Sequence, residues 1–473
     1  MAISNSKFSS RKFLDGFLQG VQNVHFIGIG GSGMISLVQI LHQLGLKITG
    51  SDLNESDPLR LARELNVEVA NKQVAQNIKN PNLIIYTSAI LQNNPELVKA
   101  KSSKIPLMER NDVLGQLTNC FSNCVCVSGT HGKTTTTGMI IEILKHNKID
   151  LSAAIGGNLK SIGGYGKLGT DDILVCEACE FANHFLKLNP THSLILNIEP
   201  DHMEYFKTIE NLKNSFQQFC ERTSHRIIYY GDSADVSDVV EKARFKGQEK
   251  WSFGFEQGND FVLKNVEQIE ANRFRFQLNC FGKPVKEIFE ICIPGRHNVL
   301  NAAGAIAACY NYGDGGLSFE SIAQGLKQFK GVKRRFEFVG KVKGITVVDD
   351  YAHHPNEIMA TLKAAKSFGF KKIWAIHQPF TYSRTQMFLN AFAEALQIAD
   401  RVVLTEILGS REENLTGIKS EDLAAKIEGS CCFKTQEEAA DFVLKNAQPG
   451  DLAITLGCGD IYKCADIMVF GKY

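Results

Sequence analysis

The sequence has little of what would mark a membrane, secreted or nucleic-acid-binding protein. Nothing in its 473 residues reaches the roughly 18 consecutive apolar residues of a membrane span, and residues 1–20 do not resemble a signal peptide. Its 52 basic and 51 acidic residues leave a formal charge of +1. We therefore expect no large nucleic-acid footprint and no membrane insertion, and a cytoplasmic location is the default.

The cysteines do not form a disulfide pattern. There are 13, an odd number, and several lie in apolar runs that read as strands, such as Cys124, Cys126 and Cys176. This distribution fits reduced, buried thiols. The spacing Cys176-x-x-Cys179 is typical of metal sites, but no second pair stands at zinc-finger distance, so a metal or redox role for that motif is disfavoured.

Length and patterning predict an α/β protein with several domains. The composition, 44% hydrophobic and 22% charged, is that of a soluble globular chain, and about 150 residues per domain suggests three. Apolar strand runs alternate with helical patterns, which favours parallel sheets. We place the domain boundaries at 1–118, 119–332 and 333–473.

A glycine-rich turn within residues 125–145 predicts a phosphate-binding loop. A β-branched run leads to Gly129, the turn closes on Gly132, Lys133 and Thr134, and a helical pattern follows. Such glycines let backbone N–H groups approach phosphates at a helix N-terminus, and the lysine and hydroxyl suit phosphates and Mg²⁺. Because valine stands two positions before Gly129, where the full pattern has glycine, an ordinary strand-to-helix turn is the competing interpretation.

A second glycine motif near the N-terminus predicts a diphosphate site. Gly28, Gly30 and Gly33 follow an apolar strand and precede a helical pattern, and Asp52 ends the next strand. This is the context of a dinucleotide fingerprint, which taken alone predicts NAD. A nucleotide sugar carries the same diphosphate, so both ligands fit.

Carboxylates follow two further strand patterns of the central region. One run ends at Glu177, and the next leads to Glu199, Asp201 and His202. Hard cations that bridge phosphates take oxygen ligands, so these strand ends predict a Mg²⁺ site beside the phosphate loop. A surface glutamate or a core histidine is the commoner explanation of any one of them.

An alanine-rich helix is predicted from about residue 298 to 309. Asn298 and Asn301 lie on its first turn, where amides could contact a base edge or cap the helix; the two interpretations are equally good. Residues 106–123 look irregular and polar. Residues 251–293 alternate apolar and polar side chains in short runs, which predicts antiparallel strands at a domain edge.

A third α/β pattern fills the C-terminal region. The expected strands are 346–348, 372–376, 402–405 and 452–456, and the expected helices 356–368 and 385–398. The first strand ends in a dense polar group, Asp349-Asp350-Tyr351-Ala352-His353-His354-Pro355. Since ligands bind at the carboxyl ends of parallel strands, we expect this edge to be functional.

Together these motifs resemble the Mur ligases. The segments that carry the resemblance are Gly28-Ile29-Gly30-Gly31-Ser32-Gly33-Met34, Gly129-Thr130-His131-Gly132-Lys133-Thr134, Asn197-Ile198-Glu199-Pro200-Asp201-His202, Gly295-Arg296-His297-Asn298-Val299-Leu300-Asn301-Ala302 and Asp349 to Pro355. The resemblance covers the chain from about Val24. It implies an N-terminal Rossmann-like domain, a central ATPase domain with a phosphate loop and a C-terminal Rossmann-like domain.

The resemblance also implies an activity and its ligands. We expect an ATP-dependent ligase that joins L-alanine to the lactyl carboxylate of UDP-N-acetylmuramate through an acyl phosphate, with Mg²⁺ as the metal. The first glycine loop then holds the UDP diphosphate rather than NAD. The oligomeric state, monomer or homodimer, stays open.

Residue roles follow motif by motif from the resemblance. The residues implied in catalysis are Lys133, Glu177, His202 and Arg335, and the implied metal ligands are Thr134, Glu177 and His202. ATP binding is implied for Gly129, Thr130, His131, Gly132, Lys133, Thr134, Thr135, Asn298, Arg335, Asp350 and His353. UDP-sugar binding is implied for Gly28, Gly30, Gly31, Ser32, Gly33, Asp52 and Ser88, and amino-acid binding for Tyr351 and Arg384.

Three alternatives remain. A sister ligase would attach a recycled peptide to the same UDP-sugar; the Gly-x-Gly-Gly-x-Gly-Met form of the first loop favours alanine. An NAD-dependent oxidoreductase would leave Lys133 and the metal carboxylates unexplained. A non-catalytic nucleotide-binding regulator would not need Glu177, His202, Arg335 and Arg384.

Overall fold

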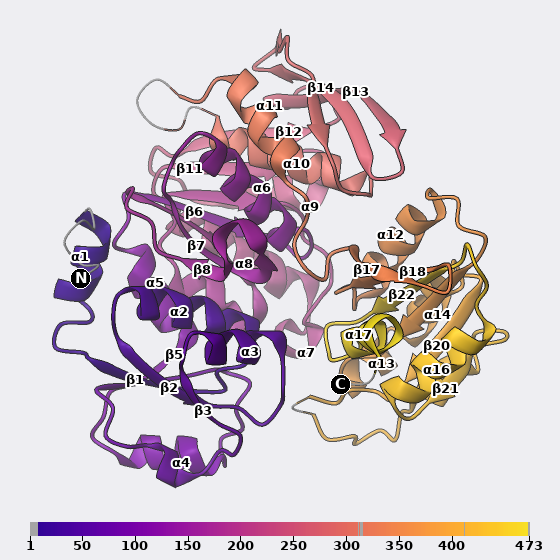
Figure 1. The fold of residues 1–473 in the computed structure, drawn as a ribbon. Helices are drawn as coiled ribbons and strands as arrows, with labels where there is room; N and C mark the ends of the chain where they lie inside the picture. The colour runs from indigo at the N-terminus through magenta and orange to yellow at the C-terminus, as the bar shows by residue number, and fades with distance from the viewer. Residues whose placement is uncertain (1–7, 311, 313–315, 411, 472–473) are drawn as a thin grey trace. The chain divides into compact units, whose positions relative to one another are not determined.

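The structure is a computed structural model that describes residues 8–310, 312, 316–410 and 412–471 (Figure 1). Its contacts divide the chain into two compact units. The first takes in most of the chain up to Lys330, and the second takes in Gly331 onward with two short segments, Gln268–Phe274 and Cys292–His297. Each unit is described by itself.

The first unit begins with a parallel sheet of order β3-β2-β1-β4-β5. Its strands are β1 (Asn23–Ile27), β2 (Lys47–Ser51), β3 (Glu68–Ala70), β4 (Leu83–Tyr86) and β5 (Leu107–Glu109), and its helices are α1 (Phe8–Asp15), α2 (Ser32–Gln43), α3 (Asp57–Glu64), α4 (Pro95–Ser102) and α5 (Arg110–Thr118). This confirms the Rossmann-like expectation. The prediction that residues 106–123 are irregular was wrong, because β5 and α5 occupy most of them; these elements are short and their apolar pattern is weak.

The second sheet of the first unit has the order β15-β14-β13-β12-β11-β10-β6-β9-β7-β8, with β16 beside β14. Its strands are β6 (Asn123–Ser128), β7 (Ser152–Leu159), β8 (Gly164–Lys167), β9 (Ile173–Glu177), β10 (His192–Ile195), β11 (Arg226–Tyr230), β12 (Glu249–Gly254), β13 (Phe261–Glu270), β14 (Arg273–Cys280), β15 (Lys283–Pro284) and β16 (Phe289–Ile291). The helices are α6 (Lys133–His146), α7 (Met203–Phe206), α8 (Ile209–Arg222), α9 (Ala234–Lys242), α10 (His297–Cys309) and α11 (Phe319–Gln328), with short 3₁₀ turns between.

The prediction of antiparallel strands over 251–293 was wrong in part. β12 pairs in parallel with both β11 and β13, and the antiparallel pairing lies at β14–β15. Alternating polarity shows only that one face of a strand is solvated. It does not fix the direction of the neighbouring strand.

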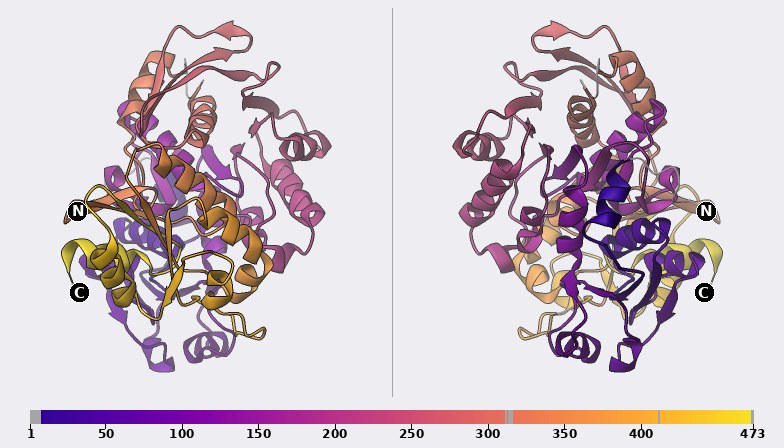
Figure 2. Two further views of the ribbon diagram at one scale, coloured as in Figure 1. Left: turned by 90° about the vertical axis from the view of Figure 1, so that its right-hand side faces the viewer. Right: turned by 90° about the vertical axis from the view of Figure 1, so that its left-hand side faces the viewer.

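The C-terminal unit holds a sheet of order β17-β18-β22-β19-β20-β21, parallel except for β17. Its elements are β17 (Glu337–Val342), β18 (Ile345–Asp350), α12 (Pro355–Lys366), β19 (Ile373–His377), α13 (Tyr382–Met387), α14 (Leu389–Leu396), β20 (Arg401–Thr405), α15 (Ser420–Ala424), β21 (Cys431–Phe433), α16 (Gln436–Asn446), β22 (Leu452–Leu456) and α17 (Tyr462–Phe470). Two apolar cores, one on each face of the sheet, pack it against these helices (Figure 2). The single helix predicted over 385–398 is instead two, broken at Phe388.

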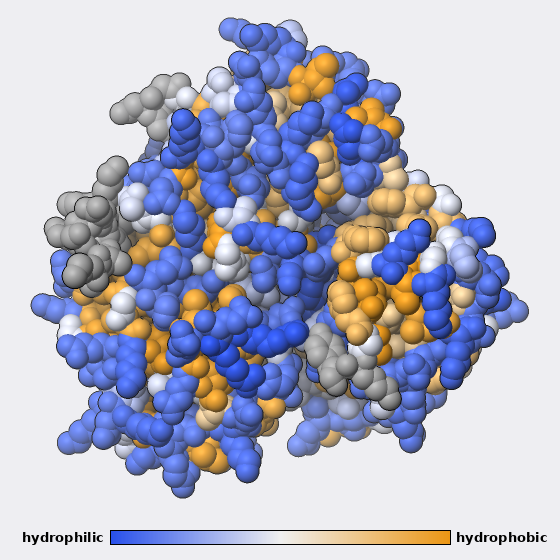
Figure 3. Space-filling view, viewed as in Figure 1, coloured by the Kyte–Doolittle hydropathy of each residue, from blue (hydrophilic) through white to orange (hydrophobic). Residues whose placement is uncertain are grey.

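The surface adds two observations. An apolar patch lies over β17 and α17 of the C-terminal unit, where Phe338 and Phe470 are exposed (Figure 3). Among the described residues, no helix combines the length and apolarity needed to cross a bilayer.

Within the first unit, α2 is bonded to the edge strand β8. The buried Gln39 side chain accepts hydrogen bonds from the backbone N–H groups of Tyr165 (2.7 Å) and Gly166 (2.8 Å) and donates one to the carbonyl of Gly163 (3.0 Å). One amide thus satisfies backbone groups of an edge that would otherwise lack a partner strand. The helix that starts at the first glycine loop is thereby fixed to the central sheet.

Replacing Gln39 by alanine should destabilise this junction. The variant leaves buried backbone groups of β8 unpaired, which costs about 1–3 kcal/mol, so we expect its melting temperature to fall by several degrees. Gln43, which is exposed and bonds the same strand at Gly166 and Leu168, is the matched control, and Gln43→Ala should lower the melting temperature less. Equal melting temperatures for wild type and Gln39→Ala would contradict this role.

Candidate active site

The phosphate loop lies between β6 and α6, as the sequence predicts. Gly129 and Gly132 have φ of 132° and 86°, the left-handed region that favours glycine. A Cβ on Gly132 would lie 2.6 Å from the Asn301 amide oxygen, so the loop also needs glycine for space. The amide N–H groups that open α6 are therefore available to an anion at the helix N-terminus.

Asn197, at the end of β10, fixes the loop from the neighbouring strand. Its side-chain oxygen accepts a hydrogen bond from the His131 N–H (2.8 Å), its amide nitrogen donates to the His131 carbonyl (3.0 Å), and its own carbonyl accepts from the Thr130 N–H (3.0 Å). The backbone of the loop at Thr130 and His131 is thus fixed by Asn197. Sequence reasoning placed Asn197 in a motif but gave it no role.

Lys133 is held by an ion pair and by its own loop. Its Nζ donates to the carboxylate of Glu180 (3.0 Å) and to the carbonyls of Thr130 (3.0 Å) and Gly129. Burial lowers the pKa of Lys133, but the adjacent Glu180 carboxylate outweighs it and the net pKa is raised. The side chain is therefore held as a cation within the loop.

A carboxylate and imidazole group stands next to this lysine. Ligand atoms of Glu180, Asp201 and His202 lie within 4.8 Å of one another, and Glu180 is only 1% exposed. Carboxylate oxygens and an imidazole nitrogen are donors that divalent cations accept. Glu177, the glutamate assigned to the metal from the sequence, ends β9, and its Oε1 accepts a hydrogen bond from the Gly156 N–H (2.6 Å).

Asn298 and Asn301 lie on the first turn of α10, as expected, and both are buried. The Asn301 amide nitrogen donates to the Asn298 side-chain oxygen (2.9 Å), and Asn301 packs on Gly132. This bond joins the two side-chain amides to each other. The structure therefore places these amides beside the phosphate loop.

The first glycine loop has the expected strand–loop–helix geometry. Gly28 has φ of 81°, and Asp52 Oδ2 accepts a hydrogen bond from the Gly30 N–H (2.8 Å). Asp52 thus also holds the loop itself. Ser88 is exposed beyond the end of β4.

Arg110 was missed by the sequence analysis. It opens α5 at the carboxyl end of β5, and a Cβ on Gly33 would lie 2.7 Å from its Nη1, so the guanidinium packs on the start of α2. Burial lowers the pKa of Arg110, while electrostatic interactions with Cys179 and Glu109 oppose this. Its position directly after β5 could have identified Arg110 from the sequence, but β5 itself was not predicted.

In the C-terminal unit, the neighbouring residues Arg334 and Arg335 have different ion-pair partners. Arg334 donates to Asp349 (2.9 Å) and to the Gly457 carbonyl (2.7 Å) and lies over the Tyr351 ring, so it is a structural residue. The Arg335 guanidinium lies 5.0 Å from the Tyr351 ring centre and 3.9 Å from the Glu357 carboxylate.

Asp350, the last residue of β18, is a carboxyl with a strongly shifted pKa. It is buried and accepts hydrogen bonds from the Phe336 N–H (2.6 Å) and the Ala352 N–H (2.8 Å). Burial, opposed by Arg335, raises the pKa of Asp350 from 3.8 to about 6.

The residues of this unit that we expect to bind the amino acid and the nucleotide lie at the same edge of its sheet. His353 Nδ1 is 3.0 Å from the Tyr351 carbonyl, and its ring meets Phe380 edge-on at 6.4 Å. Arg384 is buried on α13, which follows β19. The carboxyl ends of β18 and β19 thus bring together residues that the sequence separates.

Comparison with family models identifies the class. Residues 23–122 match "Mur ligase family, catalytic domain", residues 127–309 match "Mur ligase middle domain" and residues 334–459 match "Mur ligase, glutamate ligase domain". The chain therefore belongs to the Mur ligases, and the resemblance drawn from its motifs is confirmed.

Two curated relatives that share one name match nearly the whole chain. The UDP-N-acetylmuramate–L-alanine ligase of Acetivibrio thermocellus is 39% identical over 459 residues, which cover 95% of this chain and 96% of the relative. The enzyme of the same name from Agathobacter rectalis is 40% identical over 451 residues, covering 94% and 97%.

Solved structures agree on the three-domain α/β fold. The UDP-N-acetylmuramate–alanine ligase of Thermotoga maritima superposes with a TM-score of 0.80 at 26% identity, covering 94% of this chain and 98% of that one. A murein peptide ligase from Psychrobacter arcticus has a TM-score of 0.75 at 24% identity over the same shares, which shows the fold alone.

The raised pKa of Asp350 predicts a pH dependence of stability. The folded state binds this proton more tightly than the unfolded state, so its contribution is complete below about pH 4 and is lost as pH rises towards 6. A shift from 3.8 to about 6 corresponds to about 3 kcal/mol. Melting temperatures from pH 4 to 7.5 should show wild type losing stability relative to Asp350→Asn over this range. Two parallel curves would refute it.

Proposed function

We propose that the chain joins L-alanine to the lactyl carboxylate of UDP-N-acetylmuramate, using ATP and forming ADP and phosphate. The observation that carries this is the partly buried Lys133 cation beside the Glu180, Asp201 and His202 group, at one edge of one sheet. The substrate assignment is supported by the names of the full-length relatives.

In this reaction the bonds form and break between the substrates, and the protein takes little part in them. A lactyl carboxylate oxygen attacks the γ-phosphorus of ATP, ADP leaves, and the amine of alanine then displaces phosphate from the acyl carbon. The phosphate carries away one carboxylate oxygen. Catalysis is therefore mainly positioning and charge neutralisation, as in other phosphoryl transfers.

Each step has proposed residues. Lys133 and the N–H groups of Gly132 and Thr134 hold the ATP phosphates, and Asn298 contacts the adenine. In the C-terminal unit, Arg335 neutralises the γ-phosphate and Arg384 receives the alanine carboxylate, for which a guanidinium fork is suited.

The remaining assignments concern flanking groups. Gly129, Thr130, His131 and Thr135 complete the phosphate loop, and Asp350, Tyr351 and His353 line the nucleotide and amino-acid region. The first glycine loop, from Gly28 to Gly33, holds the UDP diphosphate. We also propose the domain division 1–118, 119–332 and 333–473, close to the division at Gly331.

The metal site fits Mg²⁺ by donor type. Its donors are two buried carboxylates and one imidazole, and oxygen donors are what Mg²⁺ prefers. We propose Glu180, Asp201, His202 and Thr134 as the residues that would hold it, with Glu177 as the alternative glutamate. When bound there, Mg²⁺ would neutralise phosphate charge.

The first test is ADP release with UDP-N-acetylmuramate and L-alanine, glycine or L-serine. Lys133→Ala should lower turnover about 100-fold or more, because it removes a preorganised cation from the transferring phosphate. Lys160→Ala, an exposed lysine of the same unit, is the control and should match wild type. Turnover in Lys133→Ala equal to that of wild type would contradict the assignment of Lys133 to the ATP phosphates. Turnover with a tripeptide but not alanine would indicate the sister ligase.

The second test separates the two glutamates. If Glu180 holds the metal, Glu180→Gln should raise the Mg²⁺ concentration that gives half-maximal turnover, and Glu177→Gln should leave it near the wild-type value. Titrating Mg²⁺ at saturating substrates measures this directly. The reverse order would assign the metal to Glu177.

A further inference from the structure

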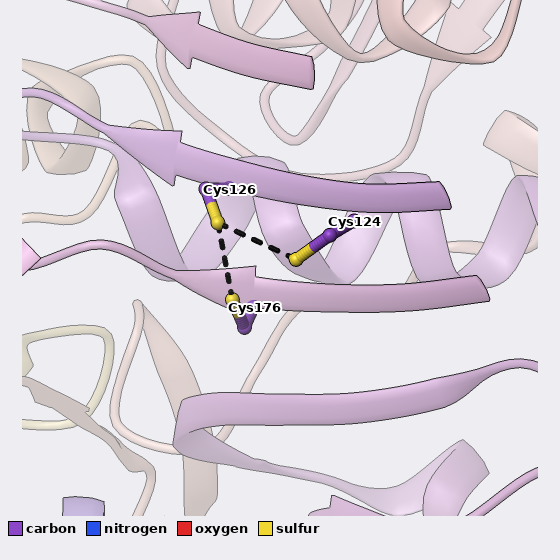
Figure 4. Close-up of side chains that lie close together, drawn as sticks. All are labelled: Cys124, Cys126 and Cys176. Atoms are coloured by element: carbon purple, nitrogen blue, oxygen red, sulfur yellow. Dashed lines mark hydrogen bonds between the residues drawn. The ribbon is translucent and has the colours of Figure 1, made fainter. Parts of the chain in front are cut away.

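Three buried thiols meet between β6 and β9. Cys124 and Cys126 are two positions apart on β6 and so share one face of the sheet, and Cys176 is the register partner of Cys126 on β9. Figure 4 shows their sulfurs converging: Cys126 Sγ lies 3.7 Å from Cys124 Sγ and 3.5 Å from Cys176 Sγ. All three sulfurs lie within 4.8 Å of one another, and all three side chains are 0% exposed.

We propose that these three cysteines form a binding site for one monovalent, thiophilic cation of the Cu(I) type. A metal–sulfur distance of about 2.3 Å puts the three ligands of a trigonal site about 4.0 Å apart. The observed separations of 3.5 and 3.7 Å require each sulfur to move by only a few tenths of an ångström. The strands therefore already hold the triangle that the ion needs.

The ligand set selects the ion. Among the described residues, this group contains three sulfurs and no histidine or carboxylate. Structural Zn²⁺ takes four tetrahedral ligands, and Mg²⁺ takes oxygen, so neither is satisfied here. Thiolates favour Cu(I) among first-row ions, and this ion needs neither a fourth ligand nor water.

The surroundings also fit a soft, low-charge ion. The three cysteines belong to an apolar core that includes Leu117 and Phe185, which keeps water and hard ligands out. Binding of Cu⁺ by three thiolates releases three protons and leaves two net negative charges. The guanidinium of Arg110 interacts electrostatically with Cys176 and offsets one of them.

The thiol site is separate from the group formed by Glu180, Asp201 and His202, but both are built on strands of the same sheet. β6 leads directly into the loop at Gly129, and β9 ends at Glu177. An ion bound to all three sulfurs would cross-link these two strands just below the loop. The inference does not depend on the proposed function, because it concerns only the packing of the thiols.

Burial decides how the site can be loaded. With all three sulfurs inaccessible, the ion must enter during folding or through local opening of the sheet. The experiment therefore supplies Cu(I) anaerobically both to the native, reduced protein and during refolding from urea. A strong Cu(I) chelator is then added in excess, and the copper that remains bound is counted.

Single alanine variants identify the ligands. Wild type should retain one chelator-resistant Cu(I) per chain by at least one loading route, with only sulfur neighbours in its X-ray absorption spectrum, and Cys124→Ala, Cys126→Ala and Cys176→Ala should each lose it. Cys220→Ala, an equally buried cysteine of α8, is the matched control and should retain it.

Two results would overturn the proposal. One is wild type that retains no copper by either route, and the other is retention unchanged in all three variants. Circular dichroism of the copper-free proteins checks folding, and a variant that misfolds is replaced by its cysteine-to-serine counterpart. A copper equivalent lost equally in Cys220→Ala would indicate nonspecific thiol binding and would also overturn it.

Discussion

The ion pair between Lys133 and Glu180 is the interaction on which the candidate site depends. A partly buried ammonium is unfavourable without a counter-charge, and Glu180 supplies one at 3.0 Å while two loop carbonyls accept the remaining donors. The loop can fold around this cation only because Gly129 and Gly132 adopt left-handed φ. The same carboxylate stands with Asp201 and His202, so a single glutamate links the cation to the proposed metal ligands.

Parallel strand order explains how distant residues form this site. β6, β9 and β10 are adjacent in the sheet, so the loop after β6, Glu180 after β9 and Asn197 after β10 meet at one carboxyl edge. The C-terminal unit repeats this arrangement with Asp350 at the end of β18 and Arg384 after β19. There, Arg334 donates hydrogen bonds to Asp349 and to the Gly457 carbonyl. We therefore propose its neighbour Arg335 for the γ-phosphate.

Much of this could be predicted from sequence, since glycine loops and β-branched runs are local signals. The strand and helix around Lys133, the loop at Gly28 and the parallel pattern of the C-terminal region depend on residues close in the chain. Arg110 and the pairing of Cys126 with Cys176 could not be predicted, because both depend on which strands are neighbours and in what register. The choice between Glu177 and Glu180 depends on the backbone after β9, where Ala182 and Asn183 take positive φ.

The central claim is that ATP activates a carboxylate of the UDP-sugar as an acyl phosphate. Labelling the lactyl carboxylate of UDP-N-acetylmuramate with ¹⁸O, running the reaction with ATP and L-alanine, and analysing the released phosphate by mass spectrometry tests this directly. The account predicts that each phosphate carries one carboxylate oxygen. Phosphate free of ¹⁸O, with amide product formed, would contradict it.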